Sequence, residues 1–296
     1  MSPSSTVELS DGATVKVRML GNGDKTKPLL IALHGAPGLS DHREPESSFE
    51  FLVSRFRVLV YDARGSGDSS LKPPYTDARW VADVDELREW AGEEKFVLAG
   101  GSYGGFLALQ YAITHPNRLL ALILRDTWAN GLRGTLNCLK TVLTSNRIKP
   151  DGDRQVRLFS GTVRDNKDFA AAFGEIVKIY TPENEREEVA QEPSTFEGNT
   201  CTIAETYKLR YETHNFAFSH NVPRFDVRSR LGEITAPTLI VTGRHDLIAI
   251  FEYSEEINRG IPESELVIFE NSGHSPPSDE PELFQKTVSE FLLKWV

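Results

Sequence analysis

The sequence predicts an α/β protein with a mostly parallel central sheet, helices on both faces of that sheet and one helical insertion. Short apolar runs alternate with segments of helical periodicity up to residue 130 and again after residue 231, a pattern typical of parallel sheets. Residues 131–230 break this alternation and are helical in character. A chain of 296 residues fits one large domain that carries an insertion.

Seven apolar runs are the predicted strands. The second to the fifth of these strands are apolar on both faces, as expected for strands that helices cover on both sides. In chain order the predicted strands are Thr14–Leu20, Pro28–Gly35, Phe56–Gly65, Phe96–Ser102, Leu119–Asp126, Ala236–Asp246 and Glu265–His274.

Apolar residues at helical spacing predict the helices and, with them, the domain organisation. The predicted helical segments are Trp80–Trp90, Tyr103–His115, Lys167–Tyr180, Cys201–His220 and Pro281–Trp295. We therefore expect a core domain of residues 1–130 and 231–296. Residues 131–230 form a helical cap, or lid, over the top of the sheet.

Charge and motif content exclude several classes of protein. Forty-three acidic residues against thirty-three basic ones give a net charge of −10, which would repel nucleic acids and anionic membranes. The N-terminal sequence lacks the features of a signal peptide and no apolar run is long enough to cross a membrane, so we expect a cytoplasmic protein. Cys138 and Cys201 form no CxxC pair, and no HExxH motif occurs. We therefore expect no disulfide framework, no metal and no other cofactor.

The sequence GGSYG at residues 100–104 indicates a serine nucleophile at Ser102. This Gly-x-Ser-x-Gly pattern follows a predicted strand and precedes a predicted helix, the context in which it presents a serine on a sharp turn. Side chains two positions away would collide with that turn, so glycine is needed at Gly100 and Gly104. An ordinary glycine-rich turn is the competing interpretation.

A serine hydroxyl needs a histidine to accept its proton and a carboxylate to orient that histidine. Asp246 and His274 end the last two predicted strands, so we expect Ser102, Asp246 and His274 to be the catalytic residues. Asp126, at the end of another predicted strand, is the alternative acid. We expect His245 to be structural.

Two backbone N–H groups must stabilise the negative charge that develops on the substrate oxygen. Tyr103 follows the serine and supplies one of them. The loop HGAPG at residues 34–38 supplies the other, with Ala36 preferred and Gly35 as the fallback. We assign His34, in the same loop, to substrate binding.

The sequence DARGSGDS at residues 62–69 follows the next predicted strand. We expect it to be mainly structural, with Asp62 and Arg64 paired to brace the loop behind the oxyanion site.

Taken in order, HGAPG, DARGSGDS, GGSYGG and the pair Asp246 and His274 resemble the α/β-hydrolase superfamily, and more narrowly its proline iminopeptidase-like branch. That branch shows H-G-G-P-G, D-x-R-G-x-G-x-S and G-G-S-[WY]-G, with a helical cap inserted after the sixth strand. Ala36 replaces the usual second glycine here, a change that keeps the main-chain donor. The resemblance covers the core and implies the α/β-hydrolase fold with a Ser-His-Asp triad.

In proline iminopeptidases, cap glutamates bind the free amino terminus of the substrate. The segment Arg210–Asn221 is similar to the part of the cap that carries one of them, which implies that Glu212 binds an amino group. The alternative is a Glu212 side chain on a solvated helix face or in a structural ion pair.

We therefore expect a serine hydrolase that acts on a small molecule or a short peptide, first of all an aminopeptidase that releases N-terminal proline or a similar small residue. An esterase or lactonase acting on a small carboxylic ester, including an ester of a secondary metabolite, is the close competitor. A binding protein that keeps the pocket without catalysis is the third hypothesis.

The acidic run Thr181–Gly198 is expected to be a solvated surface. Five aromatic residues are expected mostly to pack the cap helices, namely Trp128, Phe173, Tyr207, Phe216 and Phe218.

Overall fold

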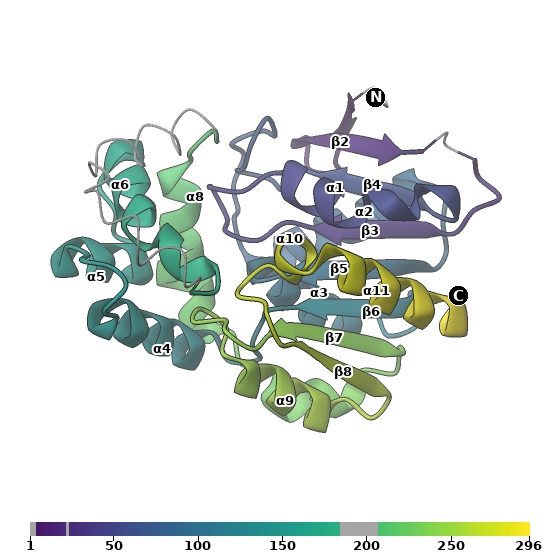
Figure 1. Ribbon diagram of the computed structural model, residues 1–296. Coiled ribbons are helices and arrows are strands. Elements are labelled where there is room, and N and C mark those ends of the chain that lie inside the picture. The colour runs from purple at the N-terminus through teal and green to yellow at the C-terminus, as the bar shows by residue number, and fades with distance from the viewer. Residues whose placement is uncertain (1–3, 22–23, 184–206) are drawn as a thin grey trace.

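The structure, a computed structural model, describes residues 4–21, 24–183 and 207–296 and contains an eight-stranded sheet (Figure 1). The strands lie in the order β1-β2-β4-β3-β5-β6-β7-β8. The pairs β1–β2 and β2–β4 are antiparallel, and all other neighbours are parallel. Their bounds are β1 Ser4–Glu8, β2 Thr14–Leu20, β3 Leu29–Leu33, β4 Arg57–Tyr61, β5 Phe96–Gly101, β6 Leu119–Arg125, β7 Thr238–Gly243 and β8 Ser264–Phe269. The predicted α/β fold is confirmed.

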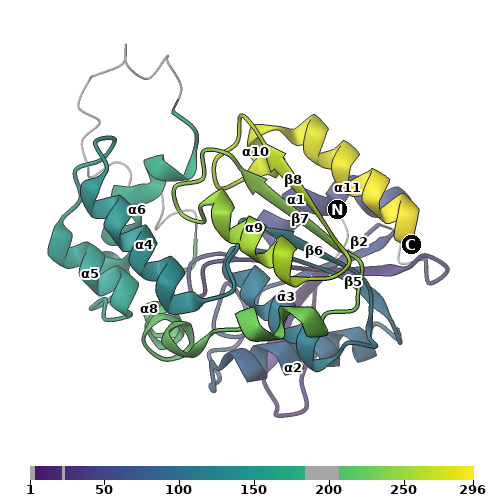
Figure 2. The same ribbon diagram turned by 90° about the horizontal axis from the view of Figure 1, so that it is seen from below.

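Helices cover both faces of this sheet. Helices α1 (Arg43–Phe49) and α11 (Pro281–Trp295) pack on one face, together with the 3-10 turn η1 (Glu50–Ser54). Helices α2 (Asp77–Trp90), α3 (Tyr103–Thr114) and α9 (Phe251–Gly260) pack on the other. Figure 2 shows α11 on one side of the strands and α2 and α3 on the opposite side. The short helix α10 (Pro276–Asp279) precedes α11.

The strand sequences explain why two covered faces form. In β3, Leu29, Ile31 and Leu33 belong to the core cluster under α2 and α3, while Leu30 and Ala32 belong to the cluster under α1 and α11. All five side chains are buried. Because successive side chains of a strand point to opposite faces, an unbroken apolar run buries both of them.

The chain between β6 and β7 forms helices, of which α4, α5, α6 and α8 lie beyond one end of the sheet (Figure 1). Side chains at Asn130, Asp151 and Asp165 accept a hydrogen bond from a backbone N–H three residues on and so begin α4, α5 and α6. The helical segments here are α4 Gly131–Thr144, α5 Gly152–Ser160, α6 Asn166–Ile176, η2 Val177–Tyr180, α8 Tyr211–Phe216, the π-helix η4 Ala217–Asn221, η5 Val222–Arg224 and η6 Arg228–Glu233. A helical insert after β6 is therefore present.

Parts of the predicted insert lie outside the described residues. These parts are Cys201 and the acidic run from residue 184 onward. The predicted helix Lys167–Tyr180 corresponds to α6 and η2, whereas Tyr207–Arg210, the first described part of the predicted helix Cys201–His220, is not helical. Across the described residues, every helix is too short or too polar to span a lipid bilayer.

Candidate active site

Ser102 sits at the sharp turn between β5 and α3, with φ 52° and ψ −121°. A non-glycine residue with this positive φ is strained and persists only where its surroundings hold it. The Ser102 N–H donates to the carbonyl of Arg125 at 2.9 Å, and the Thr127 hydroxyl donates to the Ser102 carbonyl at 2.9 Å. The end of β6 therefore holds the strained turn.

The glycines of the turn are required by close packing. A Cβ at Gly100 would lie 2.3 Å from the carbonyl oxygen of Gly104. A Cβ at Gly104 would lie 2.8 Å from the carbonyl oxygens of Leu33 and His34. Both distances are shorter than real contacts of a methyl group, so the turn forms only with glycine at both positions, as the sequence predicts.

His274 and Asp246 are brought together by the loops after β8 and β7. The Nδ1 atom of His274 lies 2.7 Å from Oδ2 of Asp246, and both side chains are almost fully buried. The other oxygen of Asp246 accepts the N–H groups of Ile248 and Ala249 at 2.7 and 2.9 Å. A histidine that donates from Nδ1 to a carboxylate keeps Nε2 as a proton acceptor.

The Nε2 atom of His274 is buried and has no hydrogen-bond partner among the described residues. No hydrogen bond to Ser102 is thus formed in this structure. Catalytic hydrogen bonds of this kind often tighten only when substrate is bound. An unpartnered buried acceptor is what a general base needs before it takes a proton.

The cap holds the histidine through Tyr180. The His274 N–H donates to the Tyr180 carbonyl at 2.7 Å, and the two rings meet edge to face with centroids 5.1 Å apart. Arg125 donates to the His274 carbonyl at 3.1 Å. Burial opposes protonation of His274, but the charge and hydrogen bond of Asp246 prevail and raise its pKa above the ordinary value.

Asp126, the alternative acid, has other partners. Its Oδ1 accepts the N–H of Gly243 at 3.1 Å, and its Oδ2 lies 3.5 Å from Arg125, which is also paired with Glu44. Complete burial, together with the nearby charge of Asp246, raises the pKa of Asp126 to about 7. The carboxylate in contact with the histidine is therefore that of Asp246.

His245 lies outside this group. Its side chain is exposed, and its backbone N–H donates to the carbonyl of Ser272 at 2.9 Å.

The HGAPG loop lies directly beside the serine. A Cβ at Gly35 would lie 3.0 Å from Cβ and 3.5 Å from Oγ of Ser102. Ala36 has φ 39° and lines the same cavity as Ser102 and Tyr103. Tyr103 begins α3, so its N–H belongs to the positive end of that helix. Gly35, Ala36 and Tyr103 thus lie close around Ser102.

His34 is placed as a brace and not at the cavity wall. Its Nε2 accepts the N–H of Ala63 at 3.0 Å, so Nδ1 carries the proton and donates to the Gly35 carbonyl at 2.7 Å. Both ring nitrogens are occupied by backbone groups. The substrate-binding role assigned to His34 therefore has no free ring nitrogen to support it.

The expected pair between Asp62 and Arg64 does not form, although both residues do brace loops. Arg64 is fully buried and donates to Asp83 at 2.8 and 2.9 Å and to Asp11 at 2.6 and 3.1 Å. Asp62 instead accepts hydrogen bonds from His42 at 2.6 and 2.9 Å. The expectation was wrong because Asp62 bonds to His42, and Arg64 bonds to Asp83 and Asp11, which all lie on other segments.

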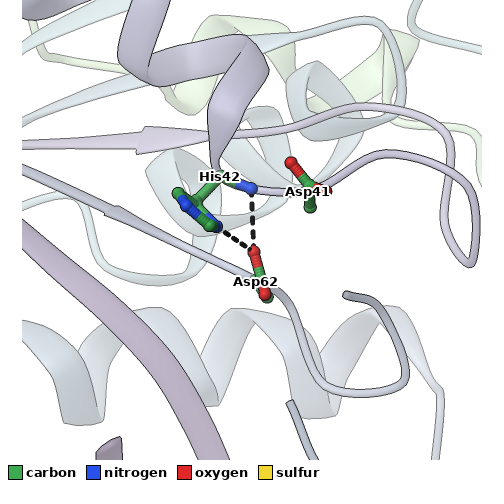
Figure 3. Close-up of side chains that lie close together, drawn as sticks. All are labelled: Asp41, His42 and Asp62. Atoms are coloured by element: carbon green, nitrogen blue, oxygen red, sulfur yellow. Dashed lines mark hydrogen bonds and ion pairs between the residues drawn. The ribbon is translucent and has the colours of Figure 1, made fainter. Parts of the chain in front are cut away.

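Asp41, His42 and Asp62 have side-chain atoms within 4.8 Å of one another (Figure 3). His42 donates to Asp62, whose hydrogen bond and charge raise the pKa of His42 against the effect of its burial. Asp41 accepts three side-chain hydrogen bonds from Arg43 at 2.6–3.1 Å. Asp62 is already bonded to His42 and Asp41 to Arg43, so this cluster ties the loop before α1 to the end of β4.

A cavity lies between Ser102 and the cap. Its walls combine core residues such as Phe106 and Ile248 with cap residues from α4, α5, α6 and α8. Eight of the lining residues are Phe, Tyr or Trp, and none of those that the structure describes is Asp, Glu, Lys or Arg. The cavity is suited to an uncharged apolar group.

His214 is the one histidine that lines this cavity among the described residues. Its Nε2 donates to the carbonyl of Leu158 at 2.9 Å, and its ring packs on Phe169 and Phe218. Burial lowers the pKa of His214 to about 4, so the ring is neutral at physiological pH. It adds no charge to the cavity.

Other expected cap residues divide between wall and surface. Glu212 is exposed on α8 and does not line the cavity. Trp128, Phe173 and Phe218 do line it, contrary to the expectation that most of the five aromatic residues only pack. Tyr207 lies under Arg43, 5.0 Å from its guanidinium, and Phe216 packs on Tyr75.

Sequence reasoning missed most of the cavity wall, including Phe106, Cys138, Phe159, Phe169 and Tyr180. These residues belong to no short motif. Only the helical spacing of apolar residues in α3 to α6 could have marked them, and that signal does not separate a packed face from a cavity wall.

A family model described as alpha/beta hydrolase fold matches residues 28–170. A proline iminopeptidase of Pestalotiopsis fici is 33% identical over 96% of this chain and 98% of its own length. A proline iminopeptidase of Saccharolobus solfataricus is 29% identical over 89% of this chain and 84% of its own. Among solved structures, a thermophilic esterase from Thermogutta terrifontis has a TM-score of 0.72 and 26% identity, with 99% of both chains covered.

Proposed function

Because the chain belongs to the α/β-hydrolase family, in its proline iminopeptidase-like branch, we propose that it is a serine hydrolase. We further propose that its substrate is a neutral carboxylic ester or lactone with an apolar acyl group. The observation that carries this proposal is the cavity beside Ser102, whose described walls are apolar and aromatic and bear no charged side chain. The similarity to an esterase over nearly the whole chain supports it.

The proposed reaction proceeds through an acyl-enzyme. His274, oriented by Asp246, takes the proton of Ser102 while Oγ attacks the substrate carbonyl carbon. The N–H groups of Tyr103 and Ala36 stabilise the resulting oxyanion, with Gly35 as the fallback for Ala36. His274 then gives its proton to the leaving alkoxide. Water, deprotonated by the same histidine, hydrolyses the acyl-enzyme and releases the acid.

An aminopeptidase that releases N-terminal proline is the second candidate, favoured by the similarity to two proline iminopeptidases. Such a substrate carries a protonated amino group, and burying that charge without a carboxylate is costly. Glu212 is exposed and lies away from the described walls. The apolar cavity would suit the proline ring but gives the ammonium group no anionic partner among the described lining residues.

Three matched substrates separate these candidates: an aryl ester of a small apolar acid, a prolyl arylamide and its N-acetylated form. We expect turnover of the ester by the wild type and none by Ser102→Ala. Glu212→Ala should leave ester turnover unchanged. Cleavage of the prolyl arylamide that is lost on acetylation and impaired in Glu212→Ala would establish the aminopeptidase in place of the esterase.

The hypothesis of a binding protein without catalysis is tested with a fluorophosphonate, which labels an activated serine. Labelling of the wild type and none of Ser102→Ala is expected. Equal labelling of both proteins would contradict an activated Ser102.

A further inference from the structure

A buried hydrogen-bond network joins Tyr103, the residue after the nucleophile, to Asn221 of the helical insert. The Tyr103 hydroxyl donates to Oδ1 of Asp77 at 2.6 Å and accepts a hydrogen bond from Nδ2 of Asn221 at 3.1 Å. The second N–H of the Asn221 amide donates to the carbonyl of Tyr75 at 2.9 Å. Each of these three side chains is at least nine-tenths buried.

The network connects three separate elements. Asp77 is the first residue of α2, Tyr103 is the first residue of α3, and Asn221 is the last residue of the π-helix η4. π-helical segments are rare and occur frequently at functional sites. The Tyr103 hydroxyl therefore joins the first turns of α2 and α3 to the last residue of η4.

The ring of Tyr103 is fixed by its neighbours as well as by its hydroxyl. It packs edge to face on Trp80 with centroids 5.8 Å apart and lies 5.0 Å from the ring of Phe106. The same ring lines the cavity, and the backbone N–H of Tyr103 is the proposed first oxyanion donor. A shift of the ring would move the cavity wall and the donor together.

Asp77 is suited to hold a hydroxyl. Its burial raises its pKa to about 6, against the opposing effect of the Tyr103 hydroxyl and of the nearby Asn221 amide. The hydrogen bond that it accepts from Tyr103 is 2.6 Å long. A hydrogen bond to a buried ionised carboxylate is shorter and stronger than one between neutral groups.

We propose that Asp77 and Asn221 are positioning residues for the hydrolysis: through the Tyr103 hydroxyl they hold the oxyanion donor and the cavity wall beside Ser102 in place. This inference rests on the proposed serine hydrolase function. Because an oxyanion contact is made only in the transition state, its loss should lower kcat more than it changes KM.

The same two helices provide a matched control. Tyr111 and Asp85, each eight residues further along α3 and α2, form an equivalent hydrogen bond of 2.7 Å. Neither residue lines the cavity, and neither forms a hydrogen bond with the described residues of the insert. Tyr111→Phe therefore removes the same chemistry between α2 and α3 away from the site.

The experiment compares kcat, KM and the free energy of unfolding for Tyr103→Phe and Tyr111→Phe on an aryl ester. We expect Tyr103→Phe to lower kcat by about 10-fold with little change in KM, since a single oxyanion donor is misplaced and not removed. Tyr111→Phe should lose similar stability and keep kcat. Asp77→Asn, which keeps an acceptor for the hydroxyl, should retain most of the activity that Asp77→Ala and Asn221→Ala lose.

Equal kcat values for Tyr103→Phe and Tyr111→Phe would overturn the inference. An increase in the KM of Tyr103→Phe with an unchanged kcat would overturn it as well. If Asp77→Ala does not fold, the two tyrosine variants decide the question. Absence of Ser102-dependent turnover by the wild type would overturn the proposed function itself, and the inference with it.

Discussion

The ionisation of a few buried side chains sets the chemistry available at Ser102. His274 keeps its Nε2 atom as a proton acceptor because its Nδ1 atom is engaged by Asp246, 2.7 Å away, and Nε2 has no hydrogen-bond partner in the part of the chain that the structure describes. Asp126 lies in the same buried region but holds the N–H of Gly243, and its pKa is raised to about 7 by burial and by the charge of Asp246. Two neighbouring carboxyl groups thus have different environments, and only one orients the histidine.

Substitution of the two acids distinguishes them. Asp246→Asn removes the carboxylate that fixes the histidine tautomer, so kcat on an aryl ester should fall by about 10⁴-fold. Asp126→Asn keeps an acceptor for the N–H of Gly243, so kcat on the same ester should fall by less than about 10-fold. Steady-state kinetics with both variants provide the measurement, and a loss in Asp126→Asn as large as that in Asp246→Asn would refute this assignment.

The pH dependence of turnover follows from the raised pKa of His274. A raised pKa means that the ring keeps its proton to higher pH, and a protonated ring cannot act as a base. We therefore expect kcat/KM to fall towards acid with a midpoint above 6.5, the ordinary value for histidine. Initial rates across the neutral range give the midpoint, and circular dichroism at each pH confirms an intact fold. A midpoint below 6.5 would show that burial outweighs the Asp246 charge.

At the scale of elements, the site depends on loops that end the strands and are braced from behind. His34 ties the HGAPG loop to Ala63 through its ring. Arg64, in the loop after β4, is enclosed by Asp83 of α2 and by Asp11. The side chains of Arg64 and Asp83 are at most 1% exposed. Water therefore cannot replace either partner if the other is removed.

Removing Arg64 tests this brace. Arg64→Met leaves the buried Asp83 carboxylate with Arg79 as its remaining cationic partner. The loss should therefore lie at or below about 3–5 kcal/mol, the cost of breaking a buried pair. Urea unfolding should show that loss in the free energy of unfolding. The exposed pair of Arg230 and Glu233 is the control, and Arg230→Ala should change stability little. Equal effects from the two variants would mean that burial does not set the strength of the pair.

At the scale of the whole molecule, the cavity exists only where distant segments meet. Ala36, Ser102 and Phe106 come from the sheet domain, whereas Phe173 and Phe218 come from helices of the insert. In the proposed reaction, the insert therefore limits the size of the acyl group that reaches Ser102. The core supplies the reacting groups.

Enlarging the cavity from the insert side should change the substrate preference. Phe173→Ala removes an aromatic wall, so kcat/KM for a bulky acyl ester should rise by about 10-fold relative to an acetyl ester, the amount that a few buried methylene groups supply. The measured quantity is the ratio of kcat/KM for the two esters. Leu136→Ala, at an exposed position on α4, should leave the ratio unchanged. An unaltered ratio in Phe173→Ala would mean that the acyl group does not contact Phe173.

Much of the fold can be predicted because its signals are local. The run Leu29–Leu33 is apolar on both faces, and the glycines around Ser102 leave room for backbone within a few residues, so strand and turn follow from short stretches of sequence. The edge strand Ser4–Glu8 was missed because four of its five side chains are exposed. A strand held mainly by backbone hydrogen bonds leaves little trace in the pattern of apolar residues.

The sequence by itself determined the α/β fold, the position of the serine turn and the candidate acid and base at the ends of β7 and β8. Only the tertiary structure decided that His274 meets Asp246 and not Asp126, that Arg64 pairs with Asp83, and that Glu212 is exposed. Local turns are set by steric limits on neighbouring residues. Partners across the chain depend instead on which charges and apolar faces come closest once the sheet and the insert have packed.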